Sequence, residues 1–140
     1  MKLRDLVMQI LEHIHLSVAS IEATQRFLKL AVPEYSPRGG GFAQGYGEWL
    51  HIGTATNYIA FTEVKGAKPI ENLRHIGLVV DDIDALMQRL RAAGIEPSDA
   101  SALDEHPHRR RVYYCDDNGV DWEFVEYLSE DPEQRNDYSH

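Results

Sequence analysis

His13 and His75 occupy the same place in two segments of the chain that repeat each other. In residues 13–18 and 75–80 the histidine comes first, and apolar residues follow at every second position. Such alternation is typical of a strand with one buried face. Imidazole is a common ligand of divalent metal ions. Two histidines at equivalent places of a pseudo-symmetric fold could therefore meet at a metal site.

The repeat continues beyond these strands into two helices. Ser20 is a suitable N-cap for a helix expected over residues 21–30. Asp82 is a suitable N-cap for a helix expected over residues 83–93, and Gly94 is at the position where glycine usually ends a helix. Each histidine strand is therefore expected to lead into one amphipathic helix.

Further strands are expected after each helix, because β-branched and aromatic residues gather there. These strands are predicted over residues 48–52, 57–63, 112–115 and 121–127. Residues 33–47 are rich in glycine and are expected to be a loop, with at most a short strand around Phe42. Residues 97–111 are also expected to be a polar loop, and residues 116–119 a turn. Each half would then be a strand, a helix and two or three strands.

A chain of 140 residues can form one domain or two small fused modules. The pattern predicts five parts in order along the chain. They are an N-terminal amphipathic segment (1–10), a first module (11–64), a linker (65–72), a second module (73–128) and a polar C-terminal tail (129–140).

The net charge of −9 argues against binding to nucleic acid, which favours basic surfaces. The basic residues within 106–111 suggest either a solvated loop or a rim that attracts anions. Cys115 is the single cysteine, which fits a reducing compartment. No apolar run is long enough for a membrane span, and the start of the chain does not look like a signal peptide. We expect a soluble cytoplasmic protein.

Three stretches of the sequence together resemble the vicinal oxygen chelate superfamily, which includes glyoxalases, bleomycin-resistance proteins and extradiol dioxygenases. They are His13–Val18, His75–Asp81 and the closing segment Asp116–Phe124. The resemblance covers roughly residues 11–127. It implies an α+β fold in which two paired βαβββ modules form a curved sheet barrel around a central cavity.

The resemblance also implies that His13, His75 and Glu123 are metal ligands. The alternation of side chains along a strand agrees with this role for Glu123. If Trp122 and Phe124 face the helices, Glu123 faces the cavity. Two imidazoles and a carboxylate suit Fe(II), and also Mn(II), Ni(II) or Zn(II). The alternatives are that the histidines are hydrogen-bonded structural residues, or that the cavity binds no metal.

Other polar and aromatic side chains are expected on the same faces of the strands. His15 and His51 are candidate catalytic acids or bases, and Tyr113 is a candidate donor to an oxyanion. Trp49 and Tyr58 are candidate substrate contacts. The alternative for each of these residues is a structural role, in which it packs in the cavity wall or orients a neighbouring side chain.

The sequence departs from one member of the resembled superfamily. Lactoylglutathione lyase has a further acidic ligand on the last strand of its first module. Here the inward positions of that strand are Tyr58, Ala60 and Thr62, and Glu63 faces away. The His-His-Glu set instead resembles extradiol dioxygenases and fosfomycin-modifying thiol transferases. We therefore expect the methylglyoxal–glutathione adduct to be a poor substrate.

The sequence is compatible with three functions. The first is a metal-dependent enzyme, of lyase, isomerase or oxygenase type, that chelates neighbouring oxygens of a small organic substrate. The second is a non-catalytic protein that binds a drug or metabolite in the same cavity. The third is thiol transfer to fosfomycin. The fold alone cannot choose among them, because fold-mates perform different chemistry.

A homodimer is expected from the start of the chain. Leu3, Leu6, Val7 and Ile10 form a stripe at helical spacing, which adds apolar surface beyond the two modules. Symmetric dimers are also the commonest soluble oligomers. The alternative is that this segment folds back on its own chain.

Overall fold

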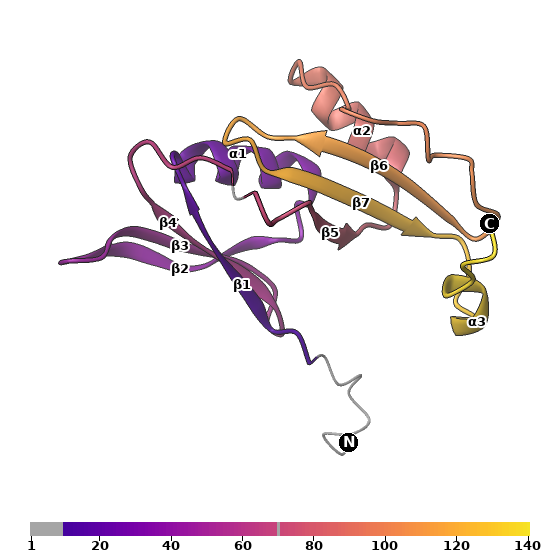
Figure 1. Cartoon of the computed structure of the whole chain (residues 1–140), viewed down its shortest axis with the longest axis horizontal. Helices are drawn as coiled ribbons and strands as arrows, with labels where there is room; N and C mark the ends of the chain where they lie inside the picture. The colour runs from indigo at the N-terminus through magenta and orange to yellow at the C-terminus, as the bar shows by residue number, and fades with distance from the viewer. Residues whose placement is uncertain (1–9, 70) are drawn as a thin grey trace. The chain divides into compact units, whose positions relative to one another are not determined.

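A computed structural model describes residues 10–69 and 71–140 of the chain (Figure 1). Most of the predicted N-terminal amphipathic segment lies outside these residues. The chain divides into two compact units. The first comprises Met1–Lys29 and Pro33–Lys68, and the second comprises Leu30–Val32 and Pro69–His140.

The first unit is built on a four-stranded sheet. Its elements in chain order are β1 (His13–Val18), α1 (Ile21–Ala31), β2 (Ser36–Ala43), β3 (Gly47–Gly53) and β4 (Tyr58–Glu63). The strand order is β1-β4-β3-β2, with β1 parallel to β4 and the other pairs antiparallel. Leu16 and Val18 are buried while His13, His15 and Ser17 are exposed, as the alternation predicted.

The second unit is built on a three-stranded sheet. Its elements are β5 (Ile76–Val79), α2 (Ile83–Ala92), β6 (Arg109–Cys115), β7 (Asp121–Tyr127) and α3 (Pro132–Arg135). The strand order is β5-β7-β6, with β5 parallel to β7 and β6 antiparallel to it. Only two strands follow α2 in the described residues, and a single bridge joins Asp99 to Tyr113 beside them.

Both predicted helix starts are confirmed. The Oγ of Ser20 accepts a hydrogen bond from the Ala23 N–H at 3.1 Å. The Glu63 carboxylate accepts a second bond from the Ile21 N–H at 2.9 Å, which places a negative charge at the positive end of α1. Asp82 caps α2 by accepting from the Ala85 N–H at 2.9 Å. Glu63, expected only to face away from Tyr58, Ala60 and Thr62, thus binds the first turn of α1.

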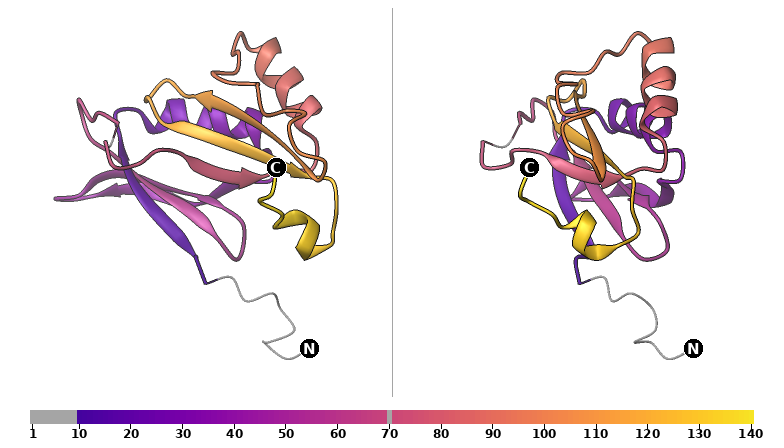
Figure 2. Two further views of the ribbon diagram at one scale, coloured as in Figure 1. Left: turned by 45° about the vertical axis from the view of Figure 1, so that its right-hand side comes forward. Right: turned by 90° about the vertical axis from the view of Figure 1, so that its right-hand side faces the viewer.

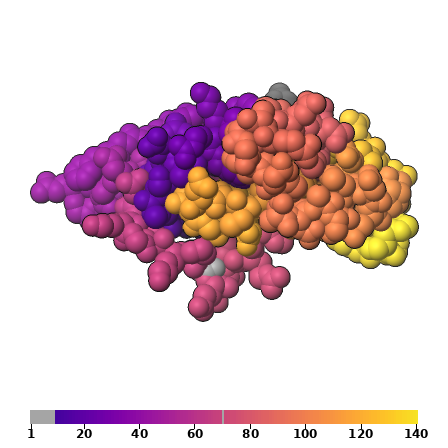
Figure 3. Space-filling view, turned by 90° about the horizontal axis from the view of Figure 1, so that it is seen from above, coloured from indigo at the N-terminus to yellow at the C-terminus, as the bar shows by residue number. Residues whose placement is uncertain are grey.

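The helix α2 covers one face of the second sheet, and Figure 3 shows part of its outer surface. Ile83, Leu86 and Leu90 are fully buried on this helix. On the strands, the fully buried side chains are Val112, Tyr114, Trp122 and Phe124. Gly94 ends the helix with a φ of 79°, where its N–H donates to the Arg91 carbonyl, as expected for a terminal glycine.

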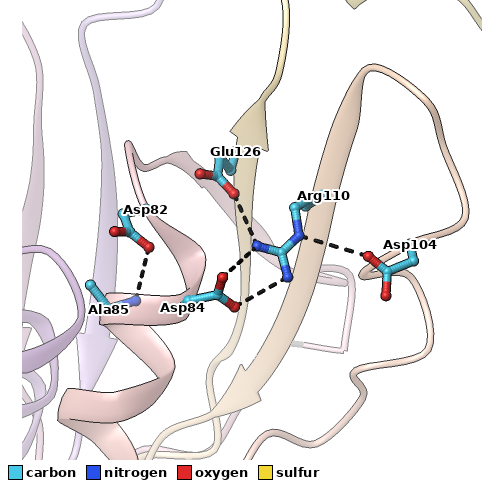
Figure 4. A network of polar contacts seen from close by, with 6 residues as sticks. All are labelled: Asp82, Asp84, Ala85, Asp104, Arg110 and Glu126. Atoms are coloured by element: carbon cyan, nitrogen blue, oxygen red, sulfur yellow. Dashed lines mark hydrogen bonds and ion pairs between the residues drawn. The ribbon is translucent and has the colours of Figure 1, made fainter.

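Polar contacts tie α2 to the strands on this same face (Figure 4). The Arg110 guanidinium donates to both carboxylate oxygens of Asp84, at 3.1 and 3.2 Å. Glu126 on β7 lies 3.4 Å from the same guanidinium, and Asp104 lies 4.0 Å away. Arg110 thus links the first turn of α2 to two neighbouring strands.

The turn between β6 and β7 is organised by one buried carboxylate. Asp116 accepts from the backbone N–H groups of Asn118 and Val120, each at 2.9 Å, and from the Trp122 indole at 3.0 Å. Gly119 completes the turn with a φ of 79°. The predicted turn at residues 116–119 is confirmed.

Two predicted loops are wrong in part. The glycine-rich segment 33–47 contains the eight-residue strand β2, which pairs with β3 through backbone groups. Strand propensity reflects the packing of side chains, so a glycine-rich segment does not indicate a strand. The edge strand β2 forms through its backbone pairing with β3. Residues Arg109–Arg111, expected as loop, already belong to β6, since their backbones pair with Tyr127, Glu126 and Val125.

The C-terminal segment is more ordered than a tail. It contains the short helix α3, which Asp131 caps by accepting from the Glu133 N–H (Figure 2). The Arg109 guanidinium donates to the Arg135 carbonyl at 3.0 Å, and Arg135 lies over the Tyr127 ring. These contacts hold the segment on the second unit. Among the described residues, no helix is long and apolar enough to cross a membrane.

Candidate metal and substrate site

His75 and Glu123 meet on the face of the second sheet that α2 leaves uncovered. Nε2 of His75 lies 2.8 Å from Oε2 of Glu123. Trp122 and Phe124 are fully buried on the opposite face, so Glu123 points away from the helix as predicted. The Glu123 side chain is only 13% exposed, so its charge needs nearby polar partners.

The strands around Glu123 provide those partners. Gly77 lies opposite Glu123 on β5, and even a Cβ there would come 3.9 Å from Oε2. A Cβ at that distance would make an ordinary van der Waals contact with the carboxylate. Nη1 of Arg111 lies 3.9 Å from the other oxygen, Oε1. Tyr113 is the direct cross-strand neighbour, and burial together with the Glu123 charge raises the pKa of its hydroxyl. Tyr113 therefore stays protonated at neutral pH and can donate a hydrogen bond.

The spacing of His75 and Glu123 suits two ligands of one ion. An ion that holds its ligands at about 2.1 Å and at right angles, as in octahedral coordination, places neighbouring ligand atoms about 3.0 Å apart, whereas the tetrahedral arrangement usual for zinc places them about 3.4 Å apart. The observed 2.8 Å is the length of a direct hydrogen bond, and it is closer to the octahedral separation. One nitrogen and one oxygen donor also match the preference of Fe(II), Mn(II), Ni(II) and Zn(II). The pair therefore supplies two of the three predicted metal ligands.

The third predicted ligand, His13, lies on β1 of the first unit. Its Nδ1 donates a hydrogen bond to the Glu12 carboxylate at 2.8 Å. Its ring stacks on Tyr58, with centroids 4.7 Å apart and planes 10° from parallel. Since Nδ1 carries the proton, Nε2 keeps its lone pair and is the ring atom that can bind a metal.

Two more predicted residues stack beside Tyr58. The rings of His51 and Tyr58 are 4.7 Å apart, and Trp49 meets His51 edge to face at 5.0 Å. Burial, assisted by the positive charge of Arg38, lowers the pKa of His51. His51 is therefore neutral at pH 7 and can accept a proton. The structure thus brings together His13, Trp49, His51 and Tyr58 on one face of the first sheet.

His15 belongs to a separate hydrogen-bonded group on the same face. Its Nε2 lies 2.6 Å from the Thr62 hydroxyl, which in turn donates to the Tyr46 hydroxyl at 3.0 Å. Nε2 and the Tyr46 hydroxyl are 3.2 Å apart. This arrangement connects His15 to a tyrosine hydroxyl on the exposed turn before β3.

The predicted residues therefore form two groups, one in each unit. In the described part of the chain, no three His, Cys, Asp or Glu side chains are grouped for a metal ion. The sequence did not point to Glu12, Arg38 or Tyr46, and it indicated Arg111 only within the basic segment 106–111, as a solvated loop or a rim that attracts anions. A carboxylate directly before a candidate histidine ligand was a signal for Glu12, whereas the other three depend on strand register and turn geometry.

Comparisons with known proteins agree with this fold. Residues 10–124 match the family described as Glyoxalase/Bleomycin resistance protein/Dioxygenase superfamily. No curated protein sequence matches the chain.

Several solved structures are similar. The fosfomycin resistance protein FosX from Listeria monocytogenes, complexed with Mn(II) and sulfate, is 18% identical with a TM-score of 0.65, over 91% of this chain and 98% of that one. A glyoxylase/bleomycin resistance protein/dioxygenase domain from Frankia is 17% identical with a TM-score of 0.68, over 86% and 98%. TnmS3, an antibiotic binding protein from Streptomyces, is 18% identical with a TM-score of 0.64, over 87% and 98%. These likenesses confirm the predicted α+β fold.

Proposed function

Because this chain belongs to the glyoxalase/bleomycin resistance protein/dioxygenase superfamily, we propose that it is a divalent-metal-dependent enzyme acting on a small organic substrate. The observation that carries the proposal is the contact between His75 and Glu123, whose ligand atoms lie 2.8 Å apart. Both side chains lie on the face of the sheet opposite the buried Trp122 and Phe124, and Gly77 beside them has no side chain.

His75 and Glu123 would hold the ion, with His13 as the third ligand. Fe(II), Mn(II), Ni(II) and Zn(II) suit this donor set, and the similar FosX structure is a complex with Mn(II). When bound, a divalent ion supplies a Lewis acid for two neighbouring oxygens of the substrate. The reaction type, lyase, isomerase or oxygenase, depends on the substrate.

The chain's own polar groups would handle protons around such a substrate. Tyr113, whose pKa is raised, donates a hydrogen bond to a substrate oxygen that becomes negative. His51, neutral at pH 7, accepts a proton. His15 exchanges protons through Thr62 and Tyr46. Trp49 and Tyr58 contact the organic part of the substrate.

Metal titration tests the proposal directly. The full chain is stripped with chelator and titrated with Mn²⁺, following free ion by electron paramagnetic resonance. We expect one ion per chain, and replacing His13, His75 or Glu123 by alanine should weaken binding at least about 10-fold. His140→Ala and Glu96→Gln remove the same side-chain types elsewhere and should leave binding unchanged. Full metal content in all three ligand variants would overturn the assignment.

A substrate panel then separates the reaction classes. It contains a catechol with Fe(II) loaded anaerobically, the methylglyoxal–glutathione adduct with Zn(II) or Ni(II), and fosfomycin with Mn(II), with and without a thiol. The adduct should be turned over poorly, because Tyr58, Ala60 and Thr62 offer no carboxylate and Glu63 is bound to the start of α1. Rapid lyase turnover of the adduct would contradict this expectation.

Two other functions remain candidates. The stacked rings of the first unit favour a non-catalytic protein that binds a drug or metabolite, and the similar TnmS3 is an antibiotic binding protein. Arg111, close to Glu123, favours a fosfomycin-modifying enzyme, because its cation could pair with a phosphonate. Recovery of a bound compound unchanged after incubation with metal would support the first. Metal-dependent loss of fosfomycin in the panel would support the second.

We also propose a homodimer. Among the described residues, β1 and β2 of the first sheet and β5 of the second have no further strand beside them, whereas residues 98–102 lie along β6. Open edges invite pairing with another chain. Light scattering at micromolar concentration should give the mass of two chains, and a monodisperse monomer would refute the proposal. Deleting residues 1–9 tests the N-terminal stripe, since an unchanged dimer would exclude it from the interface.

A further inference from the structure

Four aromatic side chains form a continuous row across three strands of the first unit. We call His13, Tyr58, His51 and Trp49 the ring row. Successive centroids are 4.7, 4.7 and 5.0 Å apart. These are the separations of favourable ring contacts. The row lies on the opposite face from buried Leu16, Ile59 and Phe61, so the hydrophobic core does not require it.

The strand beside the row, β2, contains three consecutive glycines, Gly39–Gly41. Gly39 pairs with His51, and Gly41 pairs with Trp49. A Cβ at Gly39 would lie 3.7 Å from the Trp49 ring, and at Gly41 it would meet nothing within 4 Å. The indole therefore lies along a strand that cannot cover it. Larger residues at these positions would bury the end of the ring row.

One cation stands over the ring row. The register of β2 shifts between Pro37 and Gly39, and the guanidinium carbon of Arg38 lies 4.3 Å from the Tyr58 centroid. Among the described residues, no carboxylate forms an ion pair with Arg38. A guanidinium over a ring keeps its N–H donors in its own plane, where they can bind a carboxylate in bidentate fashion.

We propose that the ring row and Arg38 select a planar aromatic anion, such as an aryl carboxylate. The Trp49 indole at the end of the row provides flat apolar surface, glycines leave room beside it, and Arg38 provides the charge. This inference deepens the proposed function by naming its substrate class, and it rests on that function only for the chemistry that follows binding. An aliphatic anion gains no binding affinity from stacking on the rings, and a neutral aromatic compound gains none from an ion pair with Arg38.

Three probes separate these contributions in the full chain. They are 2-naphthoate, its neutral amide and cyclohexanecarboxylate, each titrated by calorimetry with and without Mn²⁺. We expect the naphthoate to bind about 10-fold more tightly than either of the others, from one charge-assisted contact and one stacking surface. Equal affinity for the three probes would overturn the proposal.

The variant Arg38→Met tests the charge. It should weaken naphthoate binding about 10-fold and leave amide binding unchanged. Arg26→Met is the matched control, because Arg26 lies on α1 and not on the strands that carry the ring row. It should change neither probe. If Arg38→Met left naphthoate binding intact, or weakened both aromatic probes equally, Arg38 would not be the selecting cation.

The variant Gly39→Leu tests the open space without removing any ring. Its side chain would occupy the position beside Trp49, so both aromatic probes should lose affinity. Circular dichroism reports whether the variant folds, and Trp49→Leu gives a second route to the same loss. Unchanged aromatic binding in both variants would refute the site. If the protein binds naphthoate but no Mn²⁺, this inference stands and the proposed metal enzyme is refuted. If it binds Mn²⁺ but no naphthoate, the metal proposal stands and this inference is refuted.

Discussion

The carboxylate of Glu12 accepts a hydrogen bond from Nδ1 of the neighbouring His13 at 2.8 Å. The bond fixes the tautomer in which Nε2 has a lone pair, and stacking on Tyr58 fixes the plane of the ring. Carboxylates that orient ligand histidines in this way are common in metal sites. The backbone of Glu12 is itself held, since its carbonyl accepts from the Tyr58 N–H at 2.9 Å.

We predict that Glu12→Gln weakens Mn²⁺ binding several-fold while His13 stays in place. The effect should be smaller than that of His13→Ala, because the Glu12 side chain is 63% exposed and water can replace part of its interaction. The measurement is the Mn²⁺ titration described above. Glu22→Gln on α1 is the control and should bind normally. An affinity for Glu12→Gln equal to that of the unmodified protein would remove Glu12 from the site.

Asp116 is predicted to be a key contributor to stability. Its carboxylate satisfies two backbone N–H groups and the buried indole of Trp122. Burial raises the pKa of this carboxyl, so ionisation costs free energy there, yet removing the acceptor would break the hydrogen bond of the buried indole N–H. Asp116→Ala should lower the free energy of unfolding by about 2–4 kcal/mol in urea. Asp117→Ala, on the exposed neighbour, should change it by less than about 1 kcal/mol.

Local patterns in the sequence were enough to predict much of the fold. Ser20, Asp82 and Gly94 act within one turn of their own helices, so their roles follow from nearby residues alone. The face of Glu123 followed equally well from alternation, because a strand side chain has only two directions to point. Its contact with His75 then required only that β5 and β7 be neighbours.

The rest depended on information that a sequence pattern does not carry. Arg38 reaches Tyr58 because the register of β2 shifts beside it, and such a shift leaves no periodic signal. Tyr46 meets His15 only through the turn before β3. Arg111 was assigned to a loop because three consecutive arginines do not resemble a strand, although backbone pairing makes them one. The positions of Arg38, Tyr46 and Arg111 therefore depend on how distant strands and turns align, which a local sequence pattern does not show.

Gly53 is predicted to be irreplaceable at the end of β3. A Cβ there would come within 2.5 Å of the Tyr58 Cα and also press on the Asn57 carbonyl oxygen. Both obstacles are backbone, so no rotamer change can relieve them. Gly53→Ala should therefore cost about 2–3 kcal/mol of stability in a urea melt. Gly39→Ala is the matched control, since its nearest atom would be 3.7 Å away. Equal melting midpoints for the two variants would refute the steric argument.

The contact between Asp84 and Arg110 predicts a specific dependence of stability on pH. Hydrogen bonds from Arg110, and then its positive charge, lower the pKa of Asp84. A carboxyl whose folded pKa lies below its unfolded value of about 3.9 favours the folded state when it is ionised. The contribution is therefore complete well above pH 4 and is lost as the pH falls through the folded pKa. Asp84 is 76% exposed, so the contribution is small.

We predict that Asp84→Asn lowers the urea midpoint of unfolding at pH 7 by a small, reproducible amount. The difference from the unmodified protein should remain constant down to about pH 5 and shrink below about pH 4, because both proteins then carry a neutral side chain at this position. Asp81→Asn, on a carboxyl outside the Arg110 contacts, should show no such convergence. Added salt should reduce the difference at pH 7, since the pair is exposed. A difference that stayed constant from pH 7 to pH 3 would mean that the ion pair with Arg110 does not stabilise the start of α2.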